Sequence, residues 1–194
     1  MTAFPETPTP SEPFTYAPRF NTIVAGPYNS GSKVFRKGWV FPQHVFTLKW
    51  GYPSLADALS LYNFFVSMGG KFGAFTLFDF RGADASPIGR AWTGVYLGTG
   101  NGSTTTLDLP FKNGTSVTVY QNGTPKAGTV LTGGGADGRD RFTPTTAWTL
   151  GALLTVSFTG QRAFSPCHFA ADEMSFDEFS AAMSSTGIGI EETR

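Results

Sequence analysis

The sequence predicts a mainly β fold with one main α-helix, in which a β-sandwich or barrel contains an inserted small antiparallel β-module. Its 24 glycines and 13 prolines are spread along the chain, a pattern typical of short strands separated by many turns. One segment, residues 54–69, has apolar residues at helical spacing. Residues 92–160 are rich in threonine and glycine and contain Asn-Gly pairs, which favour hairpins. We therefore expect an arm (1–18), a β domain (19–91 plus 161–194, with helix 54–69) and an inserted module (92–160).

The first 18 residues are expected to form an extended arm that joins no sheet. Proline has no backbone N–H and cannot donate to a sheet ladder. A terminus of this kind is most often mobile, although three aromatic rings in it favour docking onto the rest of the chain. The prolines are Pro5, Pro8, Pro10, Pro13 and Pro18, and the aromatic residues are Phe4, Phe14 and Tyr16.

The clearest local pattern is the helix of residues 54–69. Ser54 is a typical N-cap with Asp57 in the capping-box position, and Gly69 and Gly70 can adopt the left-handed conformations that end a helix. The helix has two apolar stripes, so it needs two covers: its own sheet, and either a second layer or a neighbouring subunit. The first stripe is Leu55, Ala58, Leu59, Tyr62, Phe65 and Val66, and the second is Leu61, Phe64 and Met68.

The helix leads into residues 72–80, which are predicted to form a strand with aromatic side chains on both faces. A free monomer has little use for so many rings on one short strand, so the pattern favours self-association. The candidate self-association residues are Leu61, Phe64, Phe65, Met68, Phe72, Phe75 and Phe78.

Other strands are expected at 21–25, 33–37 and 44–50, and at 161–169 and 188–194 after the module. In 44–50, His44 shares one face with Phe46, Leu48 and Trp50. His44 is therefore expected to be a half-buried strand residue rather than a ligand or a base. Residues 180–187 are small and are expected to form a linker.

The inserted module is expected to contain strands at 93–97, 104–109, 116–121, 129–131, 141–142 and 153–159. Turns are predicted at the Asn-Gly pairs that begin at Asn101, Asn113 and Asn122. The loop 133–140 is interpreted as a flexible surface loop. A phosphate-binding loop is not favoured, because no strand and helix flank this segment as such a loop requires. A calcium-binding loop is not favoured either, because only two carboxylates, Asp137 and Asp140, lie close together in its sequence.

The composition favours association and gives no indication of a nucleic-acid or membrane partner. Charged residues are 14% of the chain, against about 25% in ordinary soluble domains. The formal net charge is zero, so little repulsion opposes contact between copies. The first residues do not resemble a signal peptide, and no apolar stretch is long enough to span a bilayer.

Candidate chemical groups are few. Cys167 is the single cysteine, and His44 and His168 are far apart in sequence. The acidic run 172–179 could pair carboxylates as a hydrolase does, but a solvated acidic edge is the favoured interpretation. We therefore expect no enzyme activity, no metal and no cofactor.

The order of motifs resembles that of the distal tail proteins of long-tailed bacteriophages and gene transfer agents. The resemblance covers nearly the whole length, and the helix-to-strand block is its most specific part. The motifs are Phe4-Pro5, Asn21-Thr22, Ser30-Gly31 with Arg36, Trp39 and Pro42, Leu61 with Phe64-Phe65 and Gly70, Gly73 to Phe75 with Asp79 and Asp84, the turn from Gly98 to Ser103, and the end from Ile190 to Arg194.

The resemblance implies a fold related to tail-tube subunits and a hexameric ring at the tail tip of a virion. Its partners would be copies of itself, the tail tube protein and the tip or hub proteins, and it would be made in the host cytoplasm. Two alternatives remain. One is a carbohydrate-binding module that stacks sugars on Trp92, Tyr96, Tyr120 or Trp148, and the other is a cell-wall hydrolase.

Overall fold

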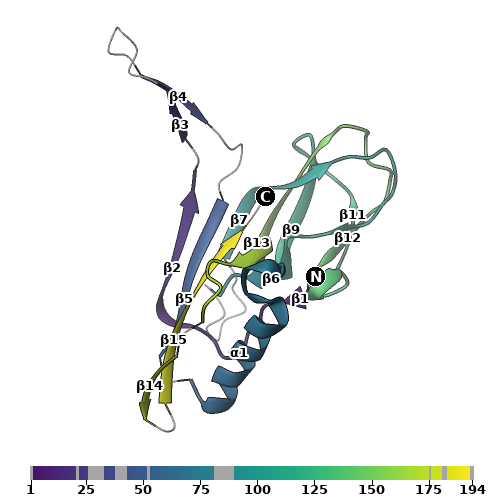
Figure 1. The fold of residues 1–194 in the computed structure, drawn as a ribbon. Helices are drawn as coiled ribbons and strands as arrows, with labels where there is room; N and C mark the ends of the chain where they lie inside the picture. The colour runs from purple at the N-terminus through teal and green to yellow at the C-terminus, as the bar shows by residue number, and fades with distance from the viewer. Residues whose placement is uncertain are drawn as a thin grey trace. The chain divides into compact units, whose positions relative to one another are not determined.

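The computed structural model describes residues 2–20, 22–25, 33–37, 43–51, 53–80, 90–174, 176–180 and 183–192. These residues are mainly β with one α-helix, and the predicted fold class is confirmed at that level (Figure 1). In chain order the elements are β1 (Thr2–Ala3), β2 (Ser11–Arg19), β3 (Thr22–Ala25), β4 (Val34–Lys37), β5 (Gln43–Gly51), α1 (Leu55–Met68), η1 (Gly70–Phe72), β6 (Phe75–Phe78), β7 (Arg90–Thr99), β8 (Leu107–Asp108), β9 (Phe111–Gln121), β10 (Thr124–Pro125), β11 (Gly128–Leu131), η2 (Ala136–Gly138), β12 (Arg141–Pro144), β13 (Leu153–Phe169), β14 (Phe176–Ser180) and β15 (Met183–Glu192).

The chain forms two compact units. Unit 1 contains Met1–Thr9 and Phe75–Phe164, and unit 2 contains Pro10–Ala74 and Ser165–Arg194. Unit 1 is larger than the expected module of residues 92–160, because it also contains β1 and β6. The expected arm is divided between the two units.

In unit 2, β15 lies between the end of β13 and β5, and β2 forms the edge of the sheet (Figure 1). The predicted alternation in β5 is confirmed, because His44, Phe46, Leu48 and Trp50 are all buried. His44 was expected to be half-buried, but it is only 4% exposed. The linker predicted at 180–187 is wrong, since β15 begins at Met183 and pairs with both β14 and β5. β3 and β4 form a separate antiparallel pair.

The prediction that the proline-rich arm joins no sheet is wrong. Thr2 and Ala3 pair with β6 in parallel, and Phe4 is buried in unit 1. β2 pairs with β5, and its register shifts between Ser11 and Thr15. Proline is tolerated there because β2 is an edge strand, whose outer side has no ladder hydrogen bonds to lose.

The helix α1 begins and ends as the sequence predicts. The Ser54 hydroxyl accepts from the backbone N–H of Asp57, and Gly69 ends the helix in the left-handed conformation at φ 64°. Gly70 is also left-handed, at φ 62°. The following segment differs from the prediction, because residues 70–72 form the short helix η1 and β6 begins only at Phe75.

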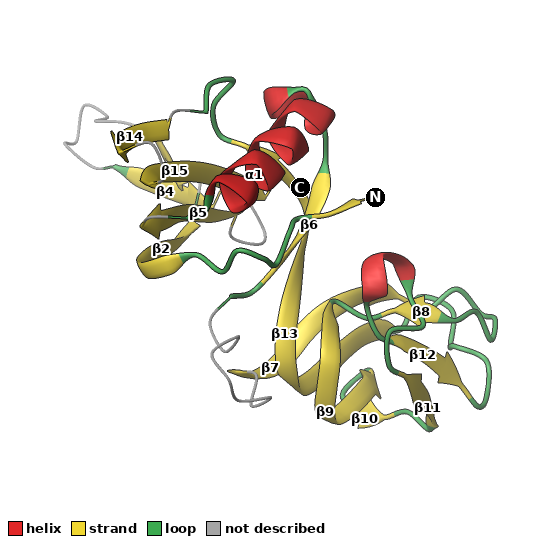
Figure 2. Ribbon diagram, turned by 90° about the horizontal axis from the view of Figure 1, so that it is seen from below, coloured by secondary structure: helices red, strands yellow, loops and turns green. Residues whose placement is uncertain are grey.

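Unit 1 is built on β13, which pairs with β7 and β9 as well as β6 (Figure 2). β8, β11 and β12 form a second, three-stranded antiparallel sheet. A buried cluster holds the unit together, and the rings of Phe111 and Phe158 stack in it with their centroids 3.8 Å apart. The cluster contains Leu109, Phe111, Val119, Phe142, Trp148, Leu154, Val156 and Phe158.

Two glycine positions that looked like breaks lie inside strands. Asn113-Gly114 was predicted to be a hairpin turn but lies within β9, where the register against β13 shifts. Gly160 was predicted to separate two strands but lies within β13. A Cβ at this position would lie 3.1 Å from the Cα of Gly114, so glycine allows two backbones to approach closely. The turn at Asn122-Gly123 is confirmed, since it connects β9 to β10.

The loop 133–140 is fixed by carboxylates, which the expectation of a flexible loop did not foresee. Asp140 is fully buried and accepts from the N–H groups of Gly114 at 2.8 Å and Gly133 at 3.0 Å. Asp137 accepts from the hydroxyl of Thr76 at 3.0 Å. Asp108 accepts from the N–H of Ala136 and from Arg141. Burial alone would raise the pKa of Asp108, but the hydrogen bonds from Arg141 and Ala136 and the charges of Arg141 and Arg139 lower it.

Gly70→Ala should destabilise the protein more than Gly69→Ala. Either change forces an alanine into the left-handed region, at a cost of about 1–2 kcal/mol. A Cβ at Gly70 would also lie 2.9 Å from the Asp172 carboxylate, whereas one at Gly69 has only an ordinary contact at 3.9 Å. We expect roughly 1 kcal/mol of additional loss for Gly70→Ala, measured by urea unfolding. Equal stability of the two variants would contradict the role of Asp172.

Asp140→Ala should lower the free energy of unfolding by about 1–3 kcal/mol, because the N–H groups of Gly114 and Gly133 lose the buried carboxylate that accepts from them. Asp140→Asn is the graded control, since its amide retains one acceptor oxygen and should lose less. Denaturant unfolding of both variants measures the effect. A fully stable Asp140→Ala variant would show that the loop does not depend on this carboxylate.

Candidate interaction surface

One side of α1 packs within unit 2. Ala58 and Leu61 are buried, and the rings of Phe64 and Phe65 lie against Phe169 at the end of β13. The Phe65 and Phe169 centroids are 4.9 Å apart at an interplanar angle of 64°, an edge-to-face arrangement that aromatic pairs prefer. This packed side combines members of both predicted stripes, Ala58 and Phe65 from the first and Leu61 and Phe64 from the second.

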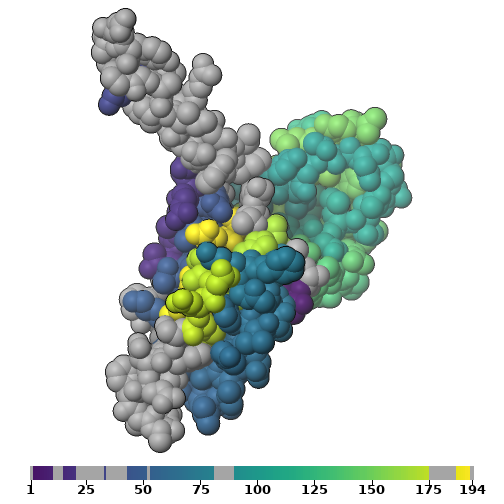
Figure 3. All heavy atoms as spheres, viewed as in Figure 1, coloured from purple at the N-terminus to yellow at the C-terminus, as the bar shows by residue number. Residues whose placement is uncertain are grey.

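Another side of α1 carries a stripe of apolar side chains that are exposed to solvent. The helix itself lies at the surface in Figure 3. The stripe consists of residues at i, i+4, i+7 and i+11, so its members lie in one row. They are Leu55 (67% exposed), Leu59 (50%), Tyr62 (45%) and Val66 (55%). We call this row the α1 stripe. Contiguous apolar surface on a folded unit commonly marks an interaction site.

The structure separates the seven predicted self-association residues into three groups. Leu61, Phe75 and Phe78 are buried, so their side chains offer no free surface for another copy. Phe64, Phe65 and Met68 are half-buried. Phe72 is 90% exposed at the end of η1. The α1 stripe was recognised in the sequence as apolar, but none of its exposed members was among the predicted contact residues.

Of the aromatic residues proposed for glycan contact, Tyr96 is the most accessible, at 42% exposed. Trp148 is buried in the core of unit 1 and donates its indole N–H to the Thr105 carbonyl. Two guanidinium groups lie over the Trp92 ring, Arg162 at 4.7 Å and Arg90 at 5.6 Å from its centroid. Tyr120 is half-buried. The structure therefore does not bring these rings together as one open stacking surface.

The histidines and the cysteine take part in packing within unit 2. His44 lies 2.8 Å from the Tyr16 hydroxyl through Nδ1 and 3.7 Å from Glu192 through Nε2, and this buried cluster joins β2, β5 and β15. His168 donates from Nδ1 to the Lys71 carbonyl. Cys167 is fully buried. Within the described part of the chain, no three His, Cys, Asp or Glu side chains are placed to hold a metal ion.

The acidic run is partly described. The Asp172 carboxylate accepts from the N–H of Lys71 at 3.0 Å, and Glu173 is exposed. The side chains of 176–179 lie outside the described residues.

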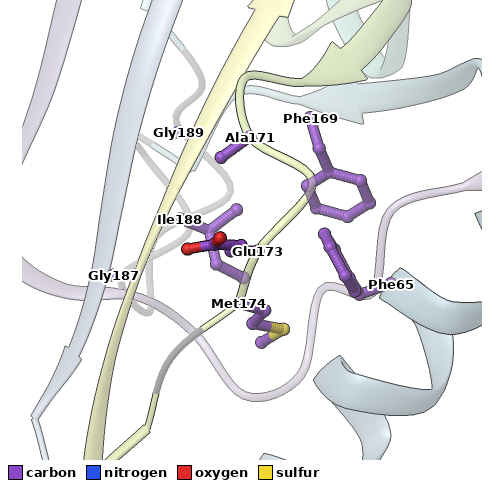
Figure 4. Close-up of a pocket in the computed structure, with 8 residues that line it drawn as sticks. All are labelled: Phe65, Phe169, Ala171, Glu173, Met174, Gly187, Ile188 and Gly189. Atoms are coloured by element: carbon purple, nitrogen blue, oxygen red, sulfur yellow. The ribbon is translucent and has the colours of Figure 1, made fainter. Parts of the chain in front are cut away.

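An open hollow with an enclosed volume of about 50 Å³ lies beside the end of α1 (Figure 4). The rings of Phe65 and Phe169 form one wall, and Glu173 and Met174 line the other side next to Ile188 (Figure 4). Its floor includes the backbone of Gly187 and Gly189, which have no side chains to fill it. Sequence patterns could not predict this hollow, because it combines residues from α1, β13 and β15 with the segment after β13.

No protein-family model and no curated protein matches this chain. Among the described helices, none has the length and apolar character needed to cross a membrane.

Proposed function

We propose that this protein is a structural subunit of a phage-like tail, which assembles into a hexameric ring at the distal end of the tail tube and joins the tube to the tip or hub. The single observation that supports assembly is the α1 stripe, a row of four apolar side chains on a short, well-capped helix. The place in a tail rests on the order of sequence motifs.

The α1 stripe suits repeated contact between copies. A helix with one side on its own sheet and an apolar row on another side can bury that row only against a further layer. The zero net charge of the chain removes the repulsion that would oppose contact between identical molecules. When the same head-to-tail contact repeats with a closing rotation, it produces a ring.

The alternatives have less support. A carbohydrate-binding module needs accessible rings, yet Trp148 is buried and Trp92 lies under two guanidinium groups. A hydrolase needs a titrating group beside a substrate-sized cleft. His44 and Cys167 are buried, His168 donates to a backbone carbonyl, and Asp172 accepts from the N–H of Lys71.

Ring formation should depend on the α1 stripe. We expect the purified chain, alone or together with the tail tube protein, to form a particle with about six times the 20.8 kDa mass of one chain. Light scattering measures this mass, and electron microscopy shows whether the particle is a closed ring. Leu59→Lys should raise the concentration needed for assembly by roughly tenfold or more, because it places a charge in an apolar contact.

The matched control is Leu150→Lys in unit 1, where Leu150 is 79% exposed. Lysine and leucine have similar helix propensities, so Leu59→Lys should unfold at nearly the same temperature as the parent. A protein that remains monomeric with its tail partners present would overturn the proposed function.

We also expect no catalysis by the purified protein or its ring. Peptidoglycan incubated with either should release no muropeptides or sugars, as measured by chromatography of the soluble fraction. Release that disappears on substitution of one carboxylate of the acidic run by alanine would contradict a purely structural role. The variants are Asp172→Ala, Glu173→Ala, Asp177→Ala and Glu178→Ala.

A further inference from the structure

Phe72 is displayed by a short turn that the rest of unit 2 holds in place. The N–H of Lys71 donates to Asp172 at 3.0 Å, and the Lys71 carbonyl accepts from His168 at 3.0 Å. Directly after it, the N–H of Gly73 donates to the Met68 carbonyl at 2.7 Å. A 90% exposed phenyl ring on a fixed backbone loses little conformational freedom on binding, so it has the properties of an interface anchor.

The hollow between α1 and β15 has the complementary properties. Its apolar lining comes from Phe65, Phe169, Met174 and Ile188. The hollow is shallow, with an enclosed volume of about 50 Å³, well below the roughly 300–1,000 Å³ of small-molecule sites. Glu173 is exposed and is one of the residues that line the hollow (Figure 4).

The charges beside the two features are opposite. Lys71 is exposed next to Phe72, and Glu173 is exposed at the hollow. An aromatic ring preceded in sequence by a cation therefore matches an apolar hollow bordered by a carboxylate. Complementary charges of this kind fix the register of an interface and raise its specificity.

We propose that Phe72 of one copy inserts into the hollow of a second copy, where Lys71 pairs with Glu173. Each copy offers one anchor and one hollow, so the contact can repeat head-to-tail from copy to copy, as a ring requires. The proposal deepens the proposed ring function and depends on it for the biological role of the contact. The occupant is specified as a second copy of this chain.

Mixed cysteine cross-linking tests the contact directly. One preparation carries Phe72→Cys and the other carries Met174→Cys, both with Cys167→Ser, and they are mixed under oxidising conditions. A disulfide-linked dimer can then form only between copies, and mass spectrometry should find the 72–174 pair. Leu150→Cys mixed with Met174→Cys is the control and should not cross-link. The protein concentration is set well above the dissociation constant measured for Phe72→Ala, because Phe72→Cys also removes the ring, and the absence of the 72–174 product at that concentration would overturn the contact.

Affinity measurements give the second test. Phe72→Ala should raise the dissociation constant between copies by roughly 30-fold, the effect of losing an anchor residue. Lys71→Glu and Glu173→Lys should each weaken association by up to about fivefold, and the double variant should recover most of that loss. Leu150→Ala is the exposed apolar control and should leave the constant unchanged.

The outcomes separate the two proposals. Rings that form normally with Phe72→Ala and give no 72–174 product would overturn this contact and leave the ring function standing. A 72–174 product found only in open dimers would support the contact and overturn the closed ring. A parent protein that remains monomeric and does not cross-link would overturn both.

Discussion

The long strand β13 constrains most of the described structure. It has 17 residues, and it pairs with β7 and β9 in unit 1 and with β15 in unit 2. A strand bonded along both edges has its polar backbone satisfied and must place apolar side chains in the layers around it. Val156, Phe158, Phe164 and Phe169 meet that requirement. Phe169, near its end, is also the residue on which the rings of α1 pack.

Local patterns in the sequence predicted α1 and β5 correctly. The features that they failed to predict, such as the place of Gly160 inside β13, depend on long-range packing. The Ser54 cap, the glycines after Met68 and the alternation from His44 act within a few residues, so the sequence reports them directly. Gly160 has the same local appearance as a turn glycine. Its role in allowing close approach to Gly114 depends on pairing between β13 and β9, which no local pattern contains.

The same limit applies to the candidate interaction surface. The sequence showed two apolar stripes on α1, and helical spacing cannot decide which stripe the sheet covers. The structure places Leu61 inward and Leu59 outward. Phe72 was predicted to lie in a strand, but it lies in the turn η1. Asp172 and His168, about 100 residues further along the chain, stabilise this turn by hydrogen bonds that no local pattern contains. The hollow likewise combines residues that are distant in sequence.

The end of α1 connects the fold to the proposed assembly. Two left-handed glycines stop the helix within one turn, and the following backbone is bonded on both sides, so Phe72 is presented by a rigid segment. Association costs less when the contact residues are ordered beforehand. A flexible tail with the same aromatic residue would lose more entropy for the same buried area. The backbone conformation that ends the helix therefore also prepares the surface that another copy could bind.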